Sequence, residues 1–285
     1  GPQRNPDIRG ARVGPMRASA PASSANLGAG FDCLALALEL RCSVGIELSS
    51  EWSVVAAGDD GFVIDAARRL HDGPLSITVE SDIPIARGLG SSAALLAALA
   101  AAISRLDGET DDRDAIFEYV AAAEGHPDNA AAAVFGGLEL SASGGSHRLE
   151  VHPSLQPVVA VPDVTLPTAE ARAALPASVP LGVATRTASR ALRLVQALGA
   201  GDVELLRSVG ADELHEPYRI ALRPIIGELL DAAASAGAPF VAMSGAGPSV
   251  LALATEDLVP AIHAAFASVG ATDVLRPQIA SEGIV

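Results

Sequence analysis

The sequence has 285 residues, enough for two domains, and its core is aliphatic because 49% of residues are hydrophobic but only 3% aromatic. Its formal net charge of −15 argues against nucleic acid and anionic membranes as partners, because both repel an acidic surface. All 19 basic residues are arginine, which excludes a Walker A loop, a Schiff-base lysine and the strand lysine of protein kinases.

In chain order, the N-terminal half predicts strands around a small polar loop, Ala22–Asp32. Residues 1–15 are polar and arginine-rich and Met16 resembles a natural start, so the first 15 residues are left out of the fold prediction. In the loop, Asn26 and Asp32 flank two glycines. One interpretation is a turn in which both side chains contact the local backbone, and the other is a loop that places an amide and a carboxylate on a polar ligand. The surrounding pattern is apolar over 33–40 and predicts strands over 17–21, 42–48 and 75–80, a strand pair over 54–63 turning at 58–61, and helices over 66–71 and 91–106.

The segment Pro84–Ala93, Pro-Ile-Ala-Arg-Gly-Leu-Gly-Ser-Ser-Ala, lies between a strand-like run and an Ala/Leu-rich helix. Gly88 and Gly90 allow backbone N–H groups to turn inward, and Ser91 and Ser92 begin the helix, where free N–H groups and the dipole favour an anion. The segment therefore predicts a phosphate site, and the alternative is a helix capped by serine. The dinucleotide fingerprint does not fit, because its third glycine is missing.

A second polar cluster, Glu124 to Asn129, immediately precedes an alanine-rich helix and contains a glutamate, a histidine, an aspartate and an asparagine. Such density favours a functional site over a capped helix start, although His126 alone would more often be structural. Farther on, His215–Arg219 interrupts two helical stretches. The remaining pattern predicts a helix over 114–123, a hairpin over 138–151, a domain boundary near 153–157, a strand over 158–161, helices from 168, over 187–198 and over 225–234, and strand–glycine turn–strand over 240–253.

Cysteine content and hydropathy bear on the setting of the protein. Cys33 and Cys42 cannot form a disulfide framework, which favours a reduced, cytoplasmic location. The most apolar helical run, Ala93 to Ile103, is too short to cross a bilayer, and no signal peptide is visible.

Three glycine-rich segments, Asn26–Asp32, Pro84–Ala93 and Ser244–Ser249, occur in this order together with His126–Asn129 and His215–Arg219. This set closely resembles the GHMP small-molecule kinases, and within that family the branch that phosphorylates homoserine, from about Met16 to Leu253. The resemblance implies an α+β fold of two domains. Residues 16–153 would form the ATP-binding domain, similar to ribosomal protein S5 domain 2, and residues 154–285 a ferredoxin-like domain. It also suggests a homodimer.

The resemblance further implies roles for particular residues. ATP would be bound by Pro84, Ile85, Ala86, Arg87, Gly88, Leu89, Gly90, Ser91, Ser92, Ala93, Ser244, Gly245, Ala246 and Gly247. Mg²⁺ would be held by Ser92 and Glu124, with Glu118 as the alternative glutamate. L-Homoserine would be bound by Asn26, Asp32, His126, Thr168, Arg172 and Arg219. An aspartate suits the ammonium group, and two arginines suit the carboxylate.

Asn129, Ser92 and Glu124 are the implied catalytic residues. Some family members have an aspartate base at the position of Asn129, and an amide cannot take a proton at neutral pH. We therefore expect direct attack of the substrate hydroxyl on the γ-phosphate, with charge stabilised by Mg²⁺, loop N–H groups and Asn129. Asp128 is expected to point elsewhere.

The chain departs from the family pattern in two places, and two other functions stay open. The region from Ser50 to Ala66 is short, with Phe62 near the position of a usual asparagine, which leaves the purine preference open; Thr187–Ser189 also lacks an asparagine. The substrate could instead be another small hydroxy acid, such as shikimate, pantoate or mevalonate, but an amine-free acid would leave Asp32 facing no cation. The other alternative, a non-catalytic nucleotide-binding regulator, would predict loss of the loop serines or of Glu124, and both are present.

Overall fold

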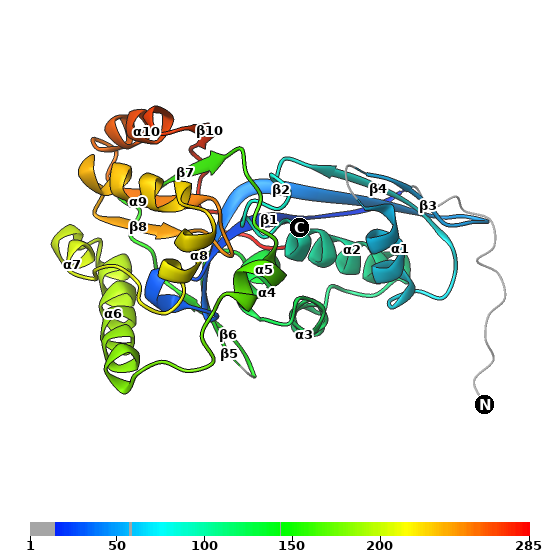
Figure 1. Cartoon of the computed structure of the whole chain (residues 1–285). Coiled ribbons are helices and arrows are strands. Elements are labelled where there is room, and N and C mark those ends of the chain that lie inside the picture. Colours follow the sequence, from blue (N-terminus) through cyan, green and yellow to red (C-terminus); the bar gives the residue numbers. More distant parts are fainter. Residues whose placement is uncertain (1–14, 57–58, 143) are drawn as a thin grey trace.

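The computed structural model describes residues 15–56, 59–142 and 144–285. The excluded residues 1–14 and part of the predicted turn at 58–61 lie outside these ranges. Figure 1 shows an elongated molecule in which one sheet with its helices occupies each end. The mixed helix-and-sheet fold in two units, predicted from the resemblance, is confirmed.

The first sheet has the order β3-β4-β2-β5-β6, and β1 pairs with β2 outside this path. Only β3 and β4 are parallel among the pairs that the structure describes. Its strands are β1 (Met16–Ala25), β2 (Leu34–Leu48), β3 (Ser53–Val55), β4 (Leu75–Ser81), β5 (Leu138–Ala142) and β6 (Gly145–Leu149). The associated helices are η1 (Gly28–Gly30), α1 (Asp60–Arg68), α2 (Ser91–Leu106), α3 (Arg113–Glu124) and α4 (Asp128–Phe135).

Helices α2 and α4 pack against β1 and β2 and against each other. Both helices are rich in alanine, and the alanines of the runs 97–98, 100–102 and 130–133 are all buried. Alanine carries no side chain beyond Cβ, so two helices and a sheet can approach closely without leaving voids. This close packing fixes the N-termini of α2 and α4, which both face the candidate site.

The second sheet has the antiparallel order β10-β7-β9-β8. Its strands are β7 (Gln156–Pro162), β8 (Phe240–Met243), β9 (Val250–Ala254) and β10 (Ala271–Leu275). Side chains alternate along β7: Val158 packs with α9 and α10, whereas Val159 joins the core of the first sheet. The accompanying helices are α5 (Thr168–Ala173), α6 (Leu181–Ala200), α7 (Val203–Arg207), α8 (Glu216–Leu222), α9 (Ile225–Ser235) and α10 (Val259–Ser268).

Residues 276–285, here called the C-terminal strap, leave the second sheet and return to the first. The Gly137 N–H donates to Ala280 O at 2.7 Å, and the Ala280 N–H donates to Ala37 O at 3.1 Å. Farther along, Ser19 and Val285 exchange two backbone hydrogen bonds of 2.9 and 3.0 Å. The strap therefore binds the two units together through the main chain.

The predicted strand pair over 54–63 is wrong. Of the residues described there, only Ser53–Val55 are strand, and Asp60–Arg68 is the helix α1. The Asp59 side chain caps this helix by accepting from the Gly61 and Phe62 N–H groups. Val63, Ala66 and Ala67 are buried at a spacing of three and four residues, which is the helical period. The apolar run 33–40 and the predicted strand over 42–48 belong to one strand, β2, while α10 and β10 were not predicted.

Within the described part of the chain, no helix has the length and apolar character needed to cross a membrane.

Candidate active site

A cavity of about 270 Å³ lies where the two units meet, at the N-termini of α2, α4 and α5. Its lining contains most of the predicted site residues: Asn26, Ile85, Ala86, Gly88, Leu89, Gly90, Ser91, Ser92, Glu124, His126, Asn129, Thr168, Arg172, Arg219, Gly245 and Ala246. Three lining residues were not predicted: Asp128, Leu166 and Pro167. The predicted residues outside this lining are Asp32, Pro84, Arg87, Ala93, Ser244 and Gly247.

The two glycine loops support each other. The Ser244 hydroxyl donates to Gly88 O at 2.8 Å, and the Gly88 backbone has a φ of +79°. A Cβ at Gly88 would overlap the Ser244 carbonyl oxygen, so this close approach requires glycine. Ser244 is fully buried and its hydroxyl is used by this contact. The second loop therefore shapes the first loop.

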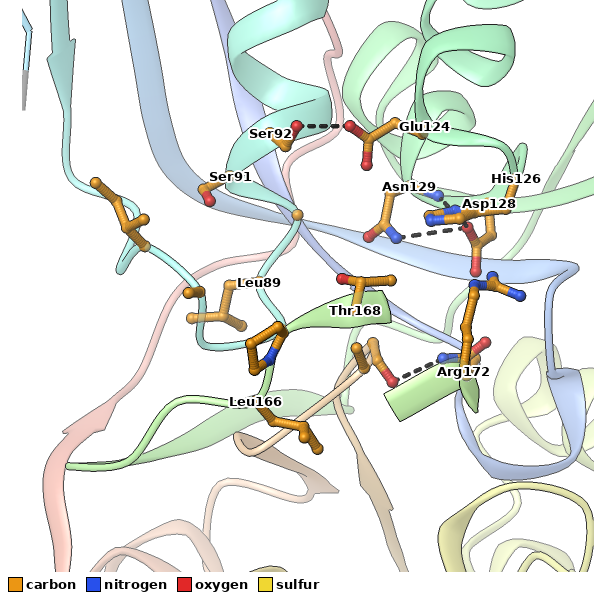
Figure 2. A pocket seen from close by; sticks show the side chains of 18 of the residues that line it. Leu89, Ser91, Ser92, Glu124, His126, Asp128, Asn129, Leu166, Thr168 and Arg172 are labelled. Carbon is orange, nitrogen blue, oxygen red and sulfur yellow. Dashed lines mark hydrogen bonds and ion pairs between the residues drawn. The ribbon is translucent and has the colours of Figure 1, made fainter. Parts of the chain in front are cut away.

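The start of α2 is open to the cavity. Its N-cap is Gly90, in a left-handed conformation with no side-chain cap bond, so the predicted alternative of a serine-capped helix is wrong. The helix therefore offers free N–H groups and the positive end of its dipole to an anion. Figure 2 shows Ser92 pointing at Glu124, and its hydroxyl donates to Glu124 Oε1 at 2.6 Å. A hydroxyl and a carboxylate thus lie together beside the uncapped N-terminus of α2.

Glu124 is the glutamate at the cavity. It ends α3, next to the left-handed Gly125 that terminates the helix. Glu118 is exposed on the same helix and is not among the lining residues. The two glutamates are six positions apart, so they lie on different faces of α3.

Asp128 was expected to point away from the site, but it lines the cavity, with 2% of its surface exposed. Its Oδ1 accepts from His126 Nδ1 at 2.7 Å and from the Asn129 backbone N–H at 2.8 Å. Burial lowers the pKa of His126, but the hydrogen bond and charge of Asp128 outweigh burial, so its pKa is raised above the usual value. Asn129 Oδ1 accepts from the Ser23 hydroxyl at 2.8 Å, and its Nδ2 donates to Asp128 Oδ1 at 3.4 Å, which leaves one Nδ2–H as the donor available to a ligand.

Across the cavity, Arg172 on α5 forms a bidentate pair with Asp32, with N···O distances of 2.6 and 3.0 Å. Asp32, predicted to bind the substrate ammonium group, and Arg172, predicted to bind its carboxylate, therefore bind each other in the protein without substrate. The Nε of Arg172 takes no part in this pair. Asn26 supports the same corner, because its Oδ1 accepts from the Asp32 N–H at 3.0 Å and its Nδ2 donates to Gly245 O at 2.7 Å.

Arg219, on α8, is a buried cation with 1% of its surface exposed and no carboxylate partner among the described residues. Its Nη1 donates to Gly245 O and to His215 Nδ1, both at 3.1 Å. Its Nε has no partner within the described chain. Burial, followed by the charge of Arg172, lowers the pKa of Arg219 to about 10, so it stays a cation at neutral pH. A buried, unpaired guanidinium at a cavity is suited to bind an anion.

Behind Arg219, burial raises the pKa of Glu216 to about 7, although its Oε1 accepts from the Met243 N–H at 2.7 Å. Because folding raises the pKa of Glu216, the folded protein loses stability as the pH rises from the unfolded-state pKa of about 4.5 to the folded-state pKa of about 7. Glu216→Gln removes this loss and keeps the acceptor. We expect its stability advantage over wild type to be about 2 kcal/mol larger at pH 8 than at pH 5.5 in urea unfolding. Glu228→Gln, an exposed glutamate on α9, is the control, and an equal effect of both variants would contradict the prediction.

Comparison with known proteins gives consistent matches over this chain. The model of the GHMP kinases N terminal domain matches residues 61–137, and that of GHMP kinases C terminal matches residues 194–272. The chain is 38% identical to a homoserine kinase of Moorella thermoacetica, over 88% of this chain and 92% of that one. It is 40% identical to a homoserine kinase of Gloeobacter violaceus, over 87% and 90% of the two chains.

Solved structures agree. The homoserine kinase of Cytophaga hutchinsonii superposes with a TM-score of 0.86 at 27% identity, covering 97% of this chain and 98% of that one. Mevalonate kinase of L. major shares the fold at 18% identity, with a TM-score of 0.71. The chain therefore belongs to the GHMP kinase family, and within it to the homoserine kinases.

Proposed function

We propose that the protein transfers the γ-phosphoryl group of ATP to the side-chain hydroxyl of L-homoserine. The observation that carries the proposal is the composition of one cavity of about 270 Å³. On one side is an uncapped helix start with the Ser92–Glu124 pair, which suits phosphates. On the other are Arg172 and Arg219, with Asp32 behind Arg172, which suit an amino acid carboxylate and ammonium.

The nucleotide base has a place beside the glycine loop. A second hollow of about 280 Å³ shares Ile85, Ser91 and Ser92 with the first cavity. Its other walls are Cys42, Ala56, Asp59, Phe62, Val63, Val79, Ser81 and Leu95. This mostly apolar hollow suits a flat heterocycle. The triphosphate would then run from this hollow past the start of α2 into the first cavity.

The residues at the helix start also fit Mg²⁺. A hydroxyl and a carboxylate 2.6 Å apart are hard oxygen ligands, and Mg²⁺ is usually bound by one or two such groups together with phosphates and water. We propose Ser92 and Glu124 as these ligands. When bound, Mg²⁺ would neutralise charge on the β- and γ-phosphates.

The acceptor hydroxyl would attack directly. The Asn129 Nδ2 has one N–H left to donate to the phosphoryl oxygens, because its other N–H contacts Asp128, and this amide cannot take a proton. The hydroxyl oxygen bonds to the γ-phosphorus as the bond to the β–γ bridging oxygen breaks, which leaves ADP. The hydroxyl proton passes to the phosphoryl oxygens. The rate then depends on alignment by the two arginines and on charge stabilisation by Asn129 and the helix start.

The test is ADP release with ATP and Mg²⁺ over a panel of L-homoserine, L-threonine, shikimate, pantoate and mevalonate. L-Homoserine should give a higher kcat/KM than shikimate, pantoate or mevalonate, because only an α-amino acid satisfies both Asp32 and the arginines. Equal or better turnover of an amine-free acid would reject the substrate assignment. Binding of ATP with no ADP release on any substrate would favour a non-catalytic regulator.

A further inference from the structure

We propose that Phe31 is a positioning residue for the substrate carboxylate, because its ring is the common support of Arg172 and Arg219. The guanidinium carbon of Arg219 lies 5.4 Å from the ring centroid, and that of Arg172 lies 5.9 Å from it. Both distances are within the range of a cation–π interaction. The two arginines come from α5 and α8 of the second unit, whereas Phe31 follows η1 of the first. One ring thus joins the three segments.

The Phe31 ring is itself held by His215, which is fully buried and stacks on it with centroids 5.0 Å apart and an interplanar angle of 25°. Burial lowers the pKa of His215 to about 4, so the imidazole is neutral at physiological pH. Its Nε2–H donates to Gly28 O at 3.1 Å, and its Nδ1 accepts from Arg219. The same histidine therefore orients the ring and one of the arginines that the ring supports.

An aromatic ring can stabilise the buried Arg219 cation without occupying its N–H groups. Arg219 is buried, and the charge of Arg172 disfavours its charged form. A carboxylate partner would stabilise Arg219 but would also compete with the substrate for its N–H groups. A ring face attracts the cation without accepting its hydrogen bonds, so the Nε of Arg219 stays unpaired. Arg172, by contrast, already has Asp32 as its partner.

This inference rests on the proposed function and is tested with variants that separate the ring face from volume. Phe31→Leu keeps an apolar side chain but removes the aromatic face, and Phe31→Tyr keeps the face. We expect Phe31→Leu to raise KM for L-homoserine about tenfold, with kcat and KM for ATP within about twofold of wild type. Phe31→Tyr should stay within about threefold for all three constants. The matched control is Phe266→Leu, on the buried face of α10, which should lower Tm without changing KM.

L-Homoserine amide, which lacks the carboxylate, separates action through the arginines from general loosening of the cavity. Its KM should be the same in wild type and Phe31→Leu. An equal rise for acid and amide, or a homoserine KM within about twofold of wild type in Phe31→Leu, would overturn the proposal.

A readout independent of turnover keeps the two proposals distinguishable. The NMR signals of the Arg172 and Arg219 Nε–H groups, assigned with lysine variants, should move in Phe31→Leu because the ring current is lost. If wild type fails to phosphorylate homoserine, the proposed function fails, and unmoved Nε–H signals would separately reject the aromatic support.

Discussion

Replacing Glu124 or Ser92 by alanine is expected to lower kcat by at least about a hundredfold, with smaller effects on KM for L-homoserine. The two side chains are joined by a hydrogen bond of 2.6 Å at the open start of α2, beside the place proposed for the γ-phosphate. Each variant removes a proposed metal ligand and leaves the other without its partner. The loss would be felt most in the transition state, where phosphoryl charge is being redistributed.

The matched control is Glu118→Ala on the same helix, because Glu118 is exposed and lies outside the cavity lining. Steady-state kinetics at several Mg²⁺ concentrations would measure both constants and the apparent metal affinity. Near-wild-type kcat in Glu124→Ala together with an inactive Glu118→Ala would transfer the metal assignment to Glu118. Wild-type kcat in all three variants would remove the metal site from this end of α2.

Arg219→Lys and Arg172→Lys are each expected to raise KM for L-homoserine about thirtyfold or more, while KM for ATP changes little. Lysine keeps the charge but is a point donor, and it cannot reproduce the planar fork that matches a carboxylate. At Arg219 the change also disrupts the contacts with Gly245 O and His215. At Arg172 it weakens the bidentate pair that positions Asp32.

Arg186→Lys provides the control, because Arg186 is an exposed arginine on α6 that pairs with Glu213. Its KM values should equal those of wild type, since surface ion pairs contribute little. A homoserine KM within about twofold of wild type in both Arg172→Lys and Arg219→Lys would place these arginines outside substrate binding. A rise for ATP as large as that for homoserine would instead indicate a general loss of structure.

The sequence was informative where local chemistry decides structure. The glycine loop Pro84–Ala93 and the helix that follows it were predicted correctly, because glycine spacing and alanine content act locally. The segment over 54–63 was predicted incorrectly. There, β3 is only three residues long and forms by parallel pairing with β4, and the Asp59 cap starts a helix whose apolar face packs on the core. Pairing of so short a strand leaves no periodic signal in the sequence, whereas the helical spacing of Val63, Ala66 and Ala67 was present and was missed.

The candidate site shows the same division. The family resemblance predicted most of the side chains that gather at the cavity, but not which of them bind one another. Asp32 and Arg172 are 140 positions apart in the chain, and nothing in their local sequence indicates that they pair in the free protein. The roles of Ser23 and Asp128 were likewise missed, because the direction of a buried side chain depends on its neighbours in the fold.

The C-terminal strap affects the order in which the first sheet is completed during synthesis at the ribosome. Ser19 pairs with Val285, and Ala37 and Gly137 both pair with Ala280, so strands synthesised first gain these main-chain partners only after the strap has been synthesised. Until then, backbone groups of the first sheet stay unpaired in the nascent chain. Chaperones can bind there, and other strands can pair there incorrectly. A fusion partner placed directly after Val285 would lie against Ser19, whereas a flexible glycine–serine spacer would let the strap dock first.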